Sequence, residues 1–145
     1  MKALNSLQPL SLLLLRVALG VIFIFHGYPK LAHSSAAMQS VFQQHRLPGY
    51  FVYVAGVLET FGGGLLIAGL FTRFAALLLA IEMGVALAKV HSVHGYMAVH
   101  EYEFPLALAT ACFVLATVGA GMLSVDYPLF EGNKGKSRPP RDPKK

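Results

Sequence analysis

The sequence predicts an all-α integral membrane protein, a four-helix bundle whose N- and C-termini are both cytoplasmic. Hydrophobic residues make up 55% of the chain and charged residues 13%, whereas water-soluble domains contain about 25% charged residues. Four stretches are long and apolar enough for a helix to cross the hydrocarbon core, which takes about 20 mostly apolar residues. Basic residues gather on one side of these stretches, as the positive-inside rule predicts for the cytoplasmic side.

The first two predicted spans are separated by the longest loop. The first span covers about residues 10–28 and ends at Gly27-Tyr28-Pro29, because glycine and proline terminate helices. The loop of residues 29–50 contains a short predicted helix, Ala36 to Arg46, at the membrane interface. The second span covers about residues 51–70.

Shorter connections join the remaining spans. Phe71-Thr72-Arg73 leads to the third span, at about residues 74–93, and a polar segment rich in His and Glu leads to the fourth, at about residues 104–123. The four spans form one predicted domain of residues 1–130. Residues 131–145 are rich in Gly, Pro, Lys and Arg, a composition that predicts a disordered, basic cytoplasmic tail.

The distribution of Lys and Arg gives the predicted orientation. Arg73 and the basic residues near both termini fall on one side of the membrane, against Lys30 and Arg46 on the other. The termini are therefore expected in the cytoplasm and the two longer loops outside. A signal peptide cleaved near Ser35-Ala36-Ala37 is the alternative. Against it, Arg16 interrupts the apolar run, whereas a signal-peptide core usually has about 7–15 apolar residues.

Four ionisable residues fall well inside the predicted spans: Arg16, Glu59, Glu82 and Lys89. Each costs about 2.5–3.5 kcal/mol near the bilayer centre on insertion scales. Their formal charges cancel, as a self-paired buried network requires. We therefore predict that they form a polar seam between the helices. Glu59, beside three glycines, is either a proton or substrate site or a structural partner of Arg16.

Small and polar residues recur at helical spacing in each span, and small residues let membrane helices approach closely. These stripes are predicted to face the seam. They consist of Arg16, Gly20, Phe23 and Gly27 in the first span, Gly56, Glu59 and Gly63 in the second, Glu82, Ala86 and Lys89 in the third, and Glu103, Ala107, Thr110, Val114, Thr117 and Gly121 in the fourth.

Histidines and charged residues gather toward the predicted outer side. They form a candidate outer mouth of the seam: His26, Lys30, His91, His94 and Glu103. His91 and His94 are spaced i, i+3, so both imidazoles can face one ligand on a helix, as metal or haem binding or a proton relay would require. A structural metal site needs a defined third and fourth ligand. We therefore assign no metal and expect neither a metal nor a haem.

Lys30 follows the Gly27-Tyr28-Pro29 segment. One interpretation is that it anchors the helix end at the lipid headgroups, since long basic side chains reach the interface. The other is that it binds an anionic or carbonyl-bearing headgroup from the outer side.

Some classes of function are excluded. The single cysteine, Cys112, rules out an internal disulfide or a CxxC redox pair and is interpreted as a core residue. The basic tail has no interleaved aromatic residues, so we expect no nucleic-acid partner. Gly62-Gly63-Gly64 lies within a span and is interpreted as packing glycine, not as a phosphate loop.

Several segments in combination carry a family resemblance. They are Arg16 to Gly20, His26 to Leu31, Glu59 to Arg73, Tyr102-Glu103, and Gly119 to Asp126. By these segments, which sample about residues 10–128, the chain resembles the DoxX family of small four-helix membrane proteins. The resemblance implies a link to quinone oxidoreduction of sulfur compounds, or to membrane complexes that handle oxidative or thiol stress. It places polar residues at the family's recurring positions without giving them catalytic roles: Arg16, His26, Lys30, Glu59, Arg73, Glu103 and Asp126.

The leading hypothesis is a plasma-membrane (bacterial inner-membrane) subunit of a quinone- or thiol-linked redox system, with quinone as the cofactor considered. Whether the chain itself is an oxidoreductase is left open. The expected partners are the bilayer, anionic lipid at the basic tail and a partner oxidoreductase, and the chain is either single or a homo-oligomer. The alternatives are a non-enzymatic scaffold and a small-solute or proton carrier. The chain shows no internal repeat of the kind that transporters often have.

Overall fold

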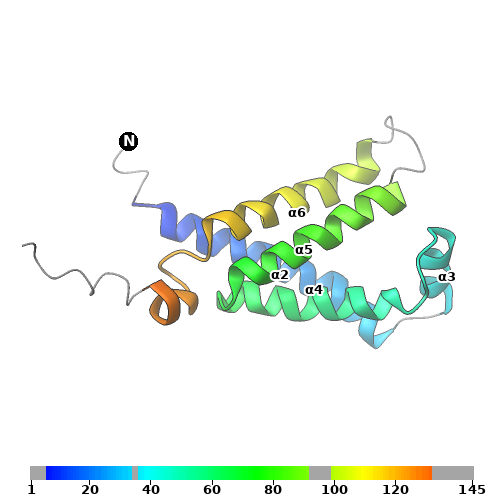
Figure 1. Cartoon of the computed structure of the whole chain (residues 1–145), viewed down its shortest axis with the longest axis horizontal. Helices are drawn as coiled ribbons and strands as arrows, with labels where there is room; N and C mark the ends of the chain where they lie inside the picture. Colours follow the sequence, from blue (N-terminus) through cyan, green and yellow to red (C-terminus); the bar gives the residue numbers. More distant parts are fainter. Residues whose placement is uncertain (1–5, 34–35, 92–98, 132–145) are drawn as a thin grey trace, which may run out of the picture.

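A computed structural model describes residues 6–33, 36–91 and 99–131 of the chain. This described part is all-helical and contains no strand, which confirms the predicted all-α class. Figure 1 shows its elements, which are α2 (Gln8–Ala32), α3 (Ala36–Gln44), α4 (Phe51–Ala68), α5 (Thr72–Ala86), the π-helix η1 (Leu87–His91), α6 (Val99–Val118) and the π-helix η3 (Tyr127–Glu131). The predicted tail, except for Glu131, and His94 lie outside the described residues.

The long helices pack as two antiparallel pairs. α2 packs mainly against α4, α5 packs mainly against α6, and α4 and α5 make a smaller contact that joins the pairs. In Figure 1 the start of α2 and η3 lie at the same end of the molecule, and α3 lies at the opposite end. α4 and α5 lie close together where the chain turns between them and diverge toward α3 (Figure 1).

The surface of this fold is apolar around its circumference. Large apolar side chains on all four long helices are exposed, among them Phe25 (75%), Phe61 (67%), Phe74 (63%) and Phe113 (59%). At the same time two charged residues are buried, Arg16 at 0% and Glu59 at 3% exposure. Water-soluble proteins rarely expose large contiguous apolar patches, so this distribution suits a lipid environment.

Two described helices are long and apolar enough to cross a membrane, Gln8–Ala32 and Phe51–Ala68. α5 is shorter, with 15 residues before η1 continues it. Residues 102–118 of α6 form a further apolar helix below the usual length. Among the described residues, two of the four predicted spans therefore meet the criteria of length and hydropathy, and part of the fourth forms a shorter apolar helix.

Glycines bring α2 and α4 into backbone contact. A Cβ atom on Gly63 would lie 2.6 Å from the carbonyl oxygen of Gly20, and a Cβ on Gly20 would meet the carbonyl oxygen of Gly63 at the same distance. Such distances are shorter than real Cβ atoms tolerate, so only glycine allows this approach. The predicted stripes on these two helices are buried as expected: Arg16, Gly20, Phe23 and Gly27 on α2, and Gly56, Glu59 and Gly63 on α4.

Gly63→Ala is expected to lower the free energy of unfolding by about 2 kcal/mol, because α2 must move away from the new methyl group. Gly64→Ala is the matched control. A Cβ on Gly64 meets nothing within 4 Å, and alanine in a helix is favoured over glycine by about 1 kcal/mol. Thermal unfolding in mild detergent measures both variants. Equal stability of the two variants would contradict the close approach of α2 and α4.

Two predicted helix ends were wrong. α2 continues through Pro29 to Ala32, because the backbone N–H of His33 bonds to the carbonyl oxygen of Pro29 at 2.9 Å and holds the last turn. α6 ends at Val118 rather than near residue 123. The reason is that Gly119 and Gly121 adopt φ angles of 94° and 77°, a left-handed conformation that ends an α-helix.

The small and polar stripe predicted on the fourth span was also wrong. Its members within α6 are exposed, whereas the buried face of α6 carries Leu108, Cys112 and Leu115. The hydroxyl groups of Thr110 and Thr117 donate to carbonyl oxygens of their own helix, Thr110 to Leu106 at 2.8 Å. Such internal bonds satisfy a hydroxyl on a lipid-facing surface, so these threonines need no neighbouring helix. The interpretation of Cys112 as a core residue is confirmed, because it is fully buried.

Candidate functional site

An apolar groove with charged residues at its base lies where α4 and α5 diverge. Its cavity has a volume of about 260 Å³. Apolar side chains of α4 and α5 form the walls, and Phe42 of α3 and Leu47 also line the cavity. Three ionisable residues also line the cavity, Lys30, Glu59 and Glu82. We call these three the polar triad of the groove.

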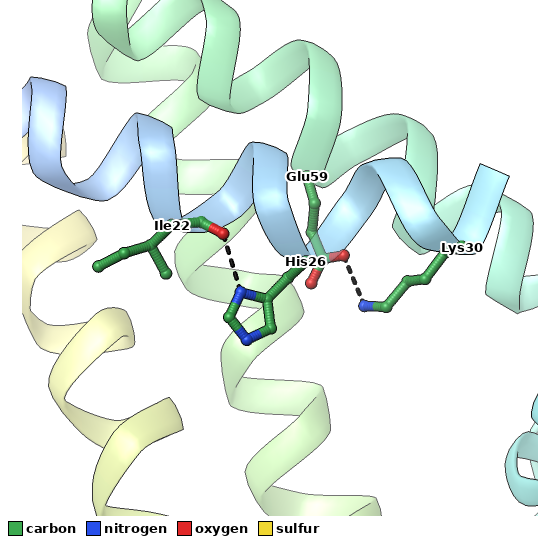
Figure 2. Close-up of polar contacts among 4 residues, drawn as sticks. All are labelled: Ile22, His26, Lys30 and Glu59. Atoms are coloured by element: carbon green, nitrogen blue, oxygen red, sulfur yellow. Dashed lines mark hydrogen bonds and ion pairs between the residues drawn. The ribbon is translucent and has the colours of Figure 1, made fainter. Parts of the chain in front are cut away.

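Lys30 and Glu59 form an ion pair between α2 and α4. The Lys30 Nζ atom donates to the Glu59 Oε2 atom at 2.5 Å, and Figure 2 shows the Glu59 carboxylate reaching from α4 toward Lys30 on α2. The Glu59 side chain is 4% exposed and the Lys30 side chain 23% exposed. The pair is therefore largely removed from solvent, which makes each charge dependent on the other.

Two glycines let the helices come close enough for this pair. A Cβ on Gly27 would lie 2.7 Å from the Cβ of Glu59, and a Cβ on Gly56 would lie 3.0 Å from the Cβ of Lys30. Larger residues at these positions would separate the two backbones from which the paired side chains extend. The glycine spacing in α2 and α4 thus positions the ion pair.

Glu82 completes the triad from α5. Both of its carboxylate oxygens are buried and have no hydrogen-bond partner among the described residues. The charges of Glu59 and Lys30 both act on it. Two carboxylates and one ammonium give the triad a formal charge of −1, which a bound proton would neutralise and a hydrogen-bond-donating ligand would stabilise. A buried carboxyl group without a partner is costly, so Glu82 is the member best suited to contact a ligand.

The predicted polar seam is divided in the structure. Glu59 and Glu82 come together, but Arg16 lies eleven residues before Gly27 on α2, roughly 16 Å along the helix axis from the level of Glu59. Glu59 therefore pairs with Lys30 and not with Arg16. Lys89 is exposed, because the wider turn of η1 changes the register of α5 and moves Lys89 off the face of Glu82.

Arg16 belongs to a second polar cluster, at the other end of the molecule. It is fully buried, and its guanidinium donates to the carbonyl oxygens of Leu66, at 3.4 Å, and Leu123. Nearby, the backbone N–H groups of Phe71 and Thr72 donate to the carboxylate of Asp126 at 2.7 and 2.8 Å. Asp126 thus binds N–H groups that have no carbonyl partner within α5, at the helix start, where a negative charge is stabilised.

The residues of the candidate outer mouth lie on three different elements. Lys30 is in the groove, and His26, one turn earlier on α2, bonds through Nδ1 to the carbonyl oxygen of Ile22 at 2.8 Å (Figure 2). The His26 ring also packs against Phe104 of α6, with ring centroids 5.7 Å apart. Glu103 is the neighbouring, exposed residue of α6. His91 ends η1, and its side chain, like all of His94, lies outside the described part.

No group of three or more His, Cys, Asp or Glu residues that could hold a metal ion occurs among the described residues. The described site is instead an apolar groove with one cation and two acidic groups. Such a lining can receive an apolar ring and hydrogen-bond its polar substituents.

The comparisons with known proteins agree on a family. The model of the family described as DoxX matches residues 11–92. A Bacillus subtilis (strain 168) protein named "Putative oxidoreductase CatD" is 32% identical over 130 residues, which cover 90% of this chain and 95% of that protein. An uncharacterized Haemophilus influenzae protein is 36% identical over 136 residues, covering 90% of this chain and 99% of the relative.

A third relative is described as a membrane protein. This uncharacterized membrane protein of Mycobacterium tuberculosis (strain H37Rv) is 26% identical over 141 residues, covering 88% of this chain and 86% of its own. No solved structure matches the chain.

Proposed function

This chain belongs to the DoxX family of membrane proteins, and from that membership we propose that it is a four-span plasma-membrane subunit of a quinone-linked redox system. The observation that carries the proposal is the polar triad at the base of an apolar groove. The name of the Bacillus subtilis relative, which describes an oxidoreductase, supports the same class of chemistry.

The proposed topology has α2, α4, α5 continued by η1, and α6 as a four-helix transmembrane bundle. Their exposed apolar side chains support it, and so does the location of the start of α2 and η3 at one end of the molecule. The K/R bias favours the cytoplasm for that end. A cysteine introduced at Ser137, in the tail proposed to be cytoplasmic, is expected to react with a membrane-impermeant thiol reagent only after the cells are opened. The native Cys112 is buried and should add little background labelling. Labelling in intact cells would reverse the proposed orientation.

The groove fits a quinone headgroup in size and in chemistry. An apolar cavity of about 150 Å³ accommodates a benzene ring, and this groove is larger, at about 260 Å³. The Lys30 ammonium is a hydrogen-bond donor for one carbonyl oxygen. Glu82, whose two oxygens have no partner among the described residues, is an O–H donor for the other carbonyl oxygen when it is protonated. When bound, a quinone would accept two electrons from a partner oxidoreductase and two protons, and become the quinol.

The chain's own residues would bind the ring and supply one proton in this scheme. The walls of α4 and α5 would exclude water from the ring, and the Lys30 ammonium would hydrogen-bond one ring oxygen. Glu82, once it has taken up a proton, would donate that proton to the other oxygen, and the second proton would come from the solvent. Glu59 holds the Lys30 ammonium in position at 2.5 Å. The chain has one cysteine and therefore no dithiol of its own, so the proposed electron source is the partner.

Glu82→Leu is expected to weaken binding of decylubiquinone about tenfold, because it removes the hydrogen bond that a protonated Glu82 would donate to a ring oxygen, and about 1.4 kcal/mol is a factor of about ten. Calorimetric titration of the protein in lipid nanodiscs measures the dissociation constant. Glu103→Leu is the matched control, since Glu103 is an exposed acid that does not line the groove, and it is expected to bind as the unmodified protein does. An absence of saturable binding by the unmodified protein would refute the proposal and favour the scaffold hypothesis.

A further inference from the structure

We infer that the groove opens sideways into the hydrocarbon phase, and that its ligand is a membrane-dissolved molecule whose polar ring lies at the triad while its apolar tail remains among the lipid chains. This inference deepens the proposed function and depends on it. It names the class of substrate, a lipid-soluble ring compound with a hydrocarbon tail, and the direction from which that compound reaches Glu82.

The exposed members of the lining place the opening between α4 and α5. Val54 on α4, with Ile81 and Val85 on α5, line the cavity and are 43%, 56% and 43% exposed. Their exposure means that the cavity reaches the molecular surface at these side chains. All three are apolar, so an opening that they border has no groups to retain water.

The polar atoms lie at the opposite, inner side of the same cavity. Glu59 is 3% exposed, and the carboxylate oxygens of Glu82 are buried. A ligand in the groove would therefore contact polar groups at its inner end and apolar side chains at its outer end. This order of contacts matches an amphiphile with one polar ring and one hydrocarbon tail.

Apolar residues also line the end of the groove toward α3. Phe42 of α3 and Leu47 line the cavity there, and α3 is held against α4 by a hydrogen bond from Gln39 Nε2 to the Tyr53 hydroxyl, at 3.3 Å. A water-dissolved ligand that came from this end would have to pass these apolar side chains. A ligand dissolved in the hydrocarbon phase would instead enter between Val54, Ile81 and Val85.

The ligand's tail would stay in an apolar environment when its ring enters the groove. Lipid chains are about as apolar as leucine side chains, so a longer tail is expected to leave the affinity nearly unchanged when ligand concentration is expressed per lipid. The affinity expressed per volume of water should instead rise in proportion to the partition of the ligand into the vesicles. A tail that projected into water would give the opposite pattern.

A tryptophan reporter tests the opening directly, because the chain contains no tryptophan. Ile81→Trp is reconstituted in phosphatidylcholine–phosphatidylglycerol vesicles, with and without brominated acyl chains. Strong quenching by the brominated chains is expected, and decylubiquinone should add a saturable quenching component. Val85→Trp is the second reporter if Ile81→Trp does not fold. Phe113→Trp, on the exposed face of α6, is the control. Brominated lipid should quench its fluorescence, and decylubiquinone should quench it without saturation.

A tail series completes the test, with the tail-less headgroup compound and decylubiquinone as probes. The dissociation constants per lipid are expected to agree within about twofold, whereas those per volume of water should differ by the measured ratio of partition coefficients. Equal constants per volume of water, or an Ile81→Trp reporter that brominated lipid does not quench, would overturn the lateral opening. Saturable binding that Glu82→Leu weakens about tenfold would leave the proposed function standing in that case, whereas no saturable binding of either probe would refute both.

Discussion

Lys30→Met is expected to lower the free energy of unfolding by about 3 kcal/mol, which is the lower end of the range for removing one member of a buried ion pair. The substitution keeps most of the length of the side chain, so little packing is lost. The Glu59 carboxylate then lacks the ammonium that lies 2.5 Å from it in the unmodified protein. It also has little access to water, since the Glu59 side chain is 4% exposed. Thermal unfolding in mild detergent, followed by circular dichroism, measures the change.

The double variant Lys30→Met/Glu59→Met separates the charge from the packing. Replacing both members of a buried pair with apolar residues of similar volume is often neutral, so the double variant should be more stable than Lys30→Met alone. The double-mutant cycle then gives a favourable coupling energy of about 2 kcal/mol or more. Additive effects of the two single substitutions would show that the pair contributes no stability.

Arg16→Met is expected to have the largest effect of the variants considered, a loss of about 4 kcal/mol. The guanidinium is fully buried and donates to the carbonyl oxygens of Leu66 and Leu123, which join α2 to the end of α4 and to the segment after α6. Methionine leaves both carbonyl oxygens without this donor and leaves a space where the guanidinium was. The unfolding temperature in detergent should fall enough for the variant to be recovered in low yield.

Arg73→Met is the matched control for Arg16. Arg73 is exposed and donates to the carbonyl oxygen of Val118 at 3.2 Å, so its replacement should cost about 1 kcal/mol or less. Arg16→Lys should also be destabilising, because an ammonium cannot reproduce the planar fork that reaches two separate carbonyl oxygens. A stability of Arg16→Met equal to that of Arg73→Met would show that the buried guanidinium is dispensable.

The sequence predicts the helices and the inner faces of α2 and α4 well. Hydropathy identifies Leu10 to Tyr28 and Phe51 to Leu70, and the helical spacing of Gly20, Gly27, Gly56 and Gly63 identifies the faces that meet. The reason is that glycines repeated at helical spacing on one face let two helix backbones approach closely. The same reasoning fails on α6, because Thr110 and Thr117 bond within their own helix and so carry no information about which face is inside.

The composition of the site could be predicted only in part. Glu59 and Glu82 are visible in the sequence as acids inside apolar spans, but the partner of Glu59 depends on the register between α2 and α4. A shift of the glycine contact by a few turns would bring Arg16 instead of Lys30 to Glu59. The exclusion of Lys89 depends on η1, and a π-helical turn leaves no clear signal in Leu87-Ala88-Lys89-Val90-His91. The contact of Asp126 with Phe71 and Thr72 joins the segments Glu59 to Arg73 and Gly119 to Asp126. The family resemblance includes both segments but does not predict that they touch.

The hydrogen bond from Arg16 to Leu123 also bears on how the chain is made. The two residues are separated by 107 positions, so Arg16 leaves the ribosome long before Leu123, which follows the last long helix, α6. α2 can meet α4, and α5 can meet α6, as soon as each second helix has been synthesised. The Arg16 guanidinium can bond to the carbonyl oxygen of Leu123 only after α6 has been synthesised. Arg16 therefore lacks one of its two carbonyl acceptors during most of translation.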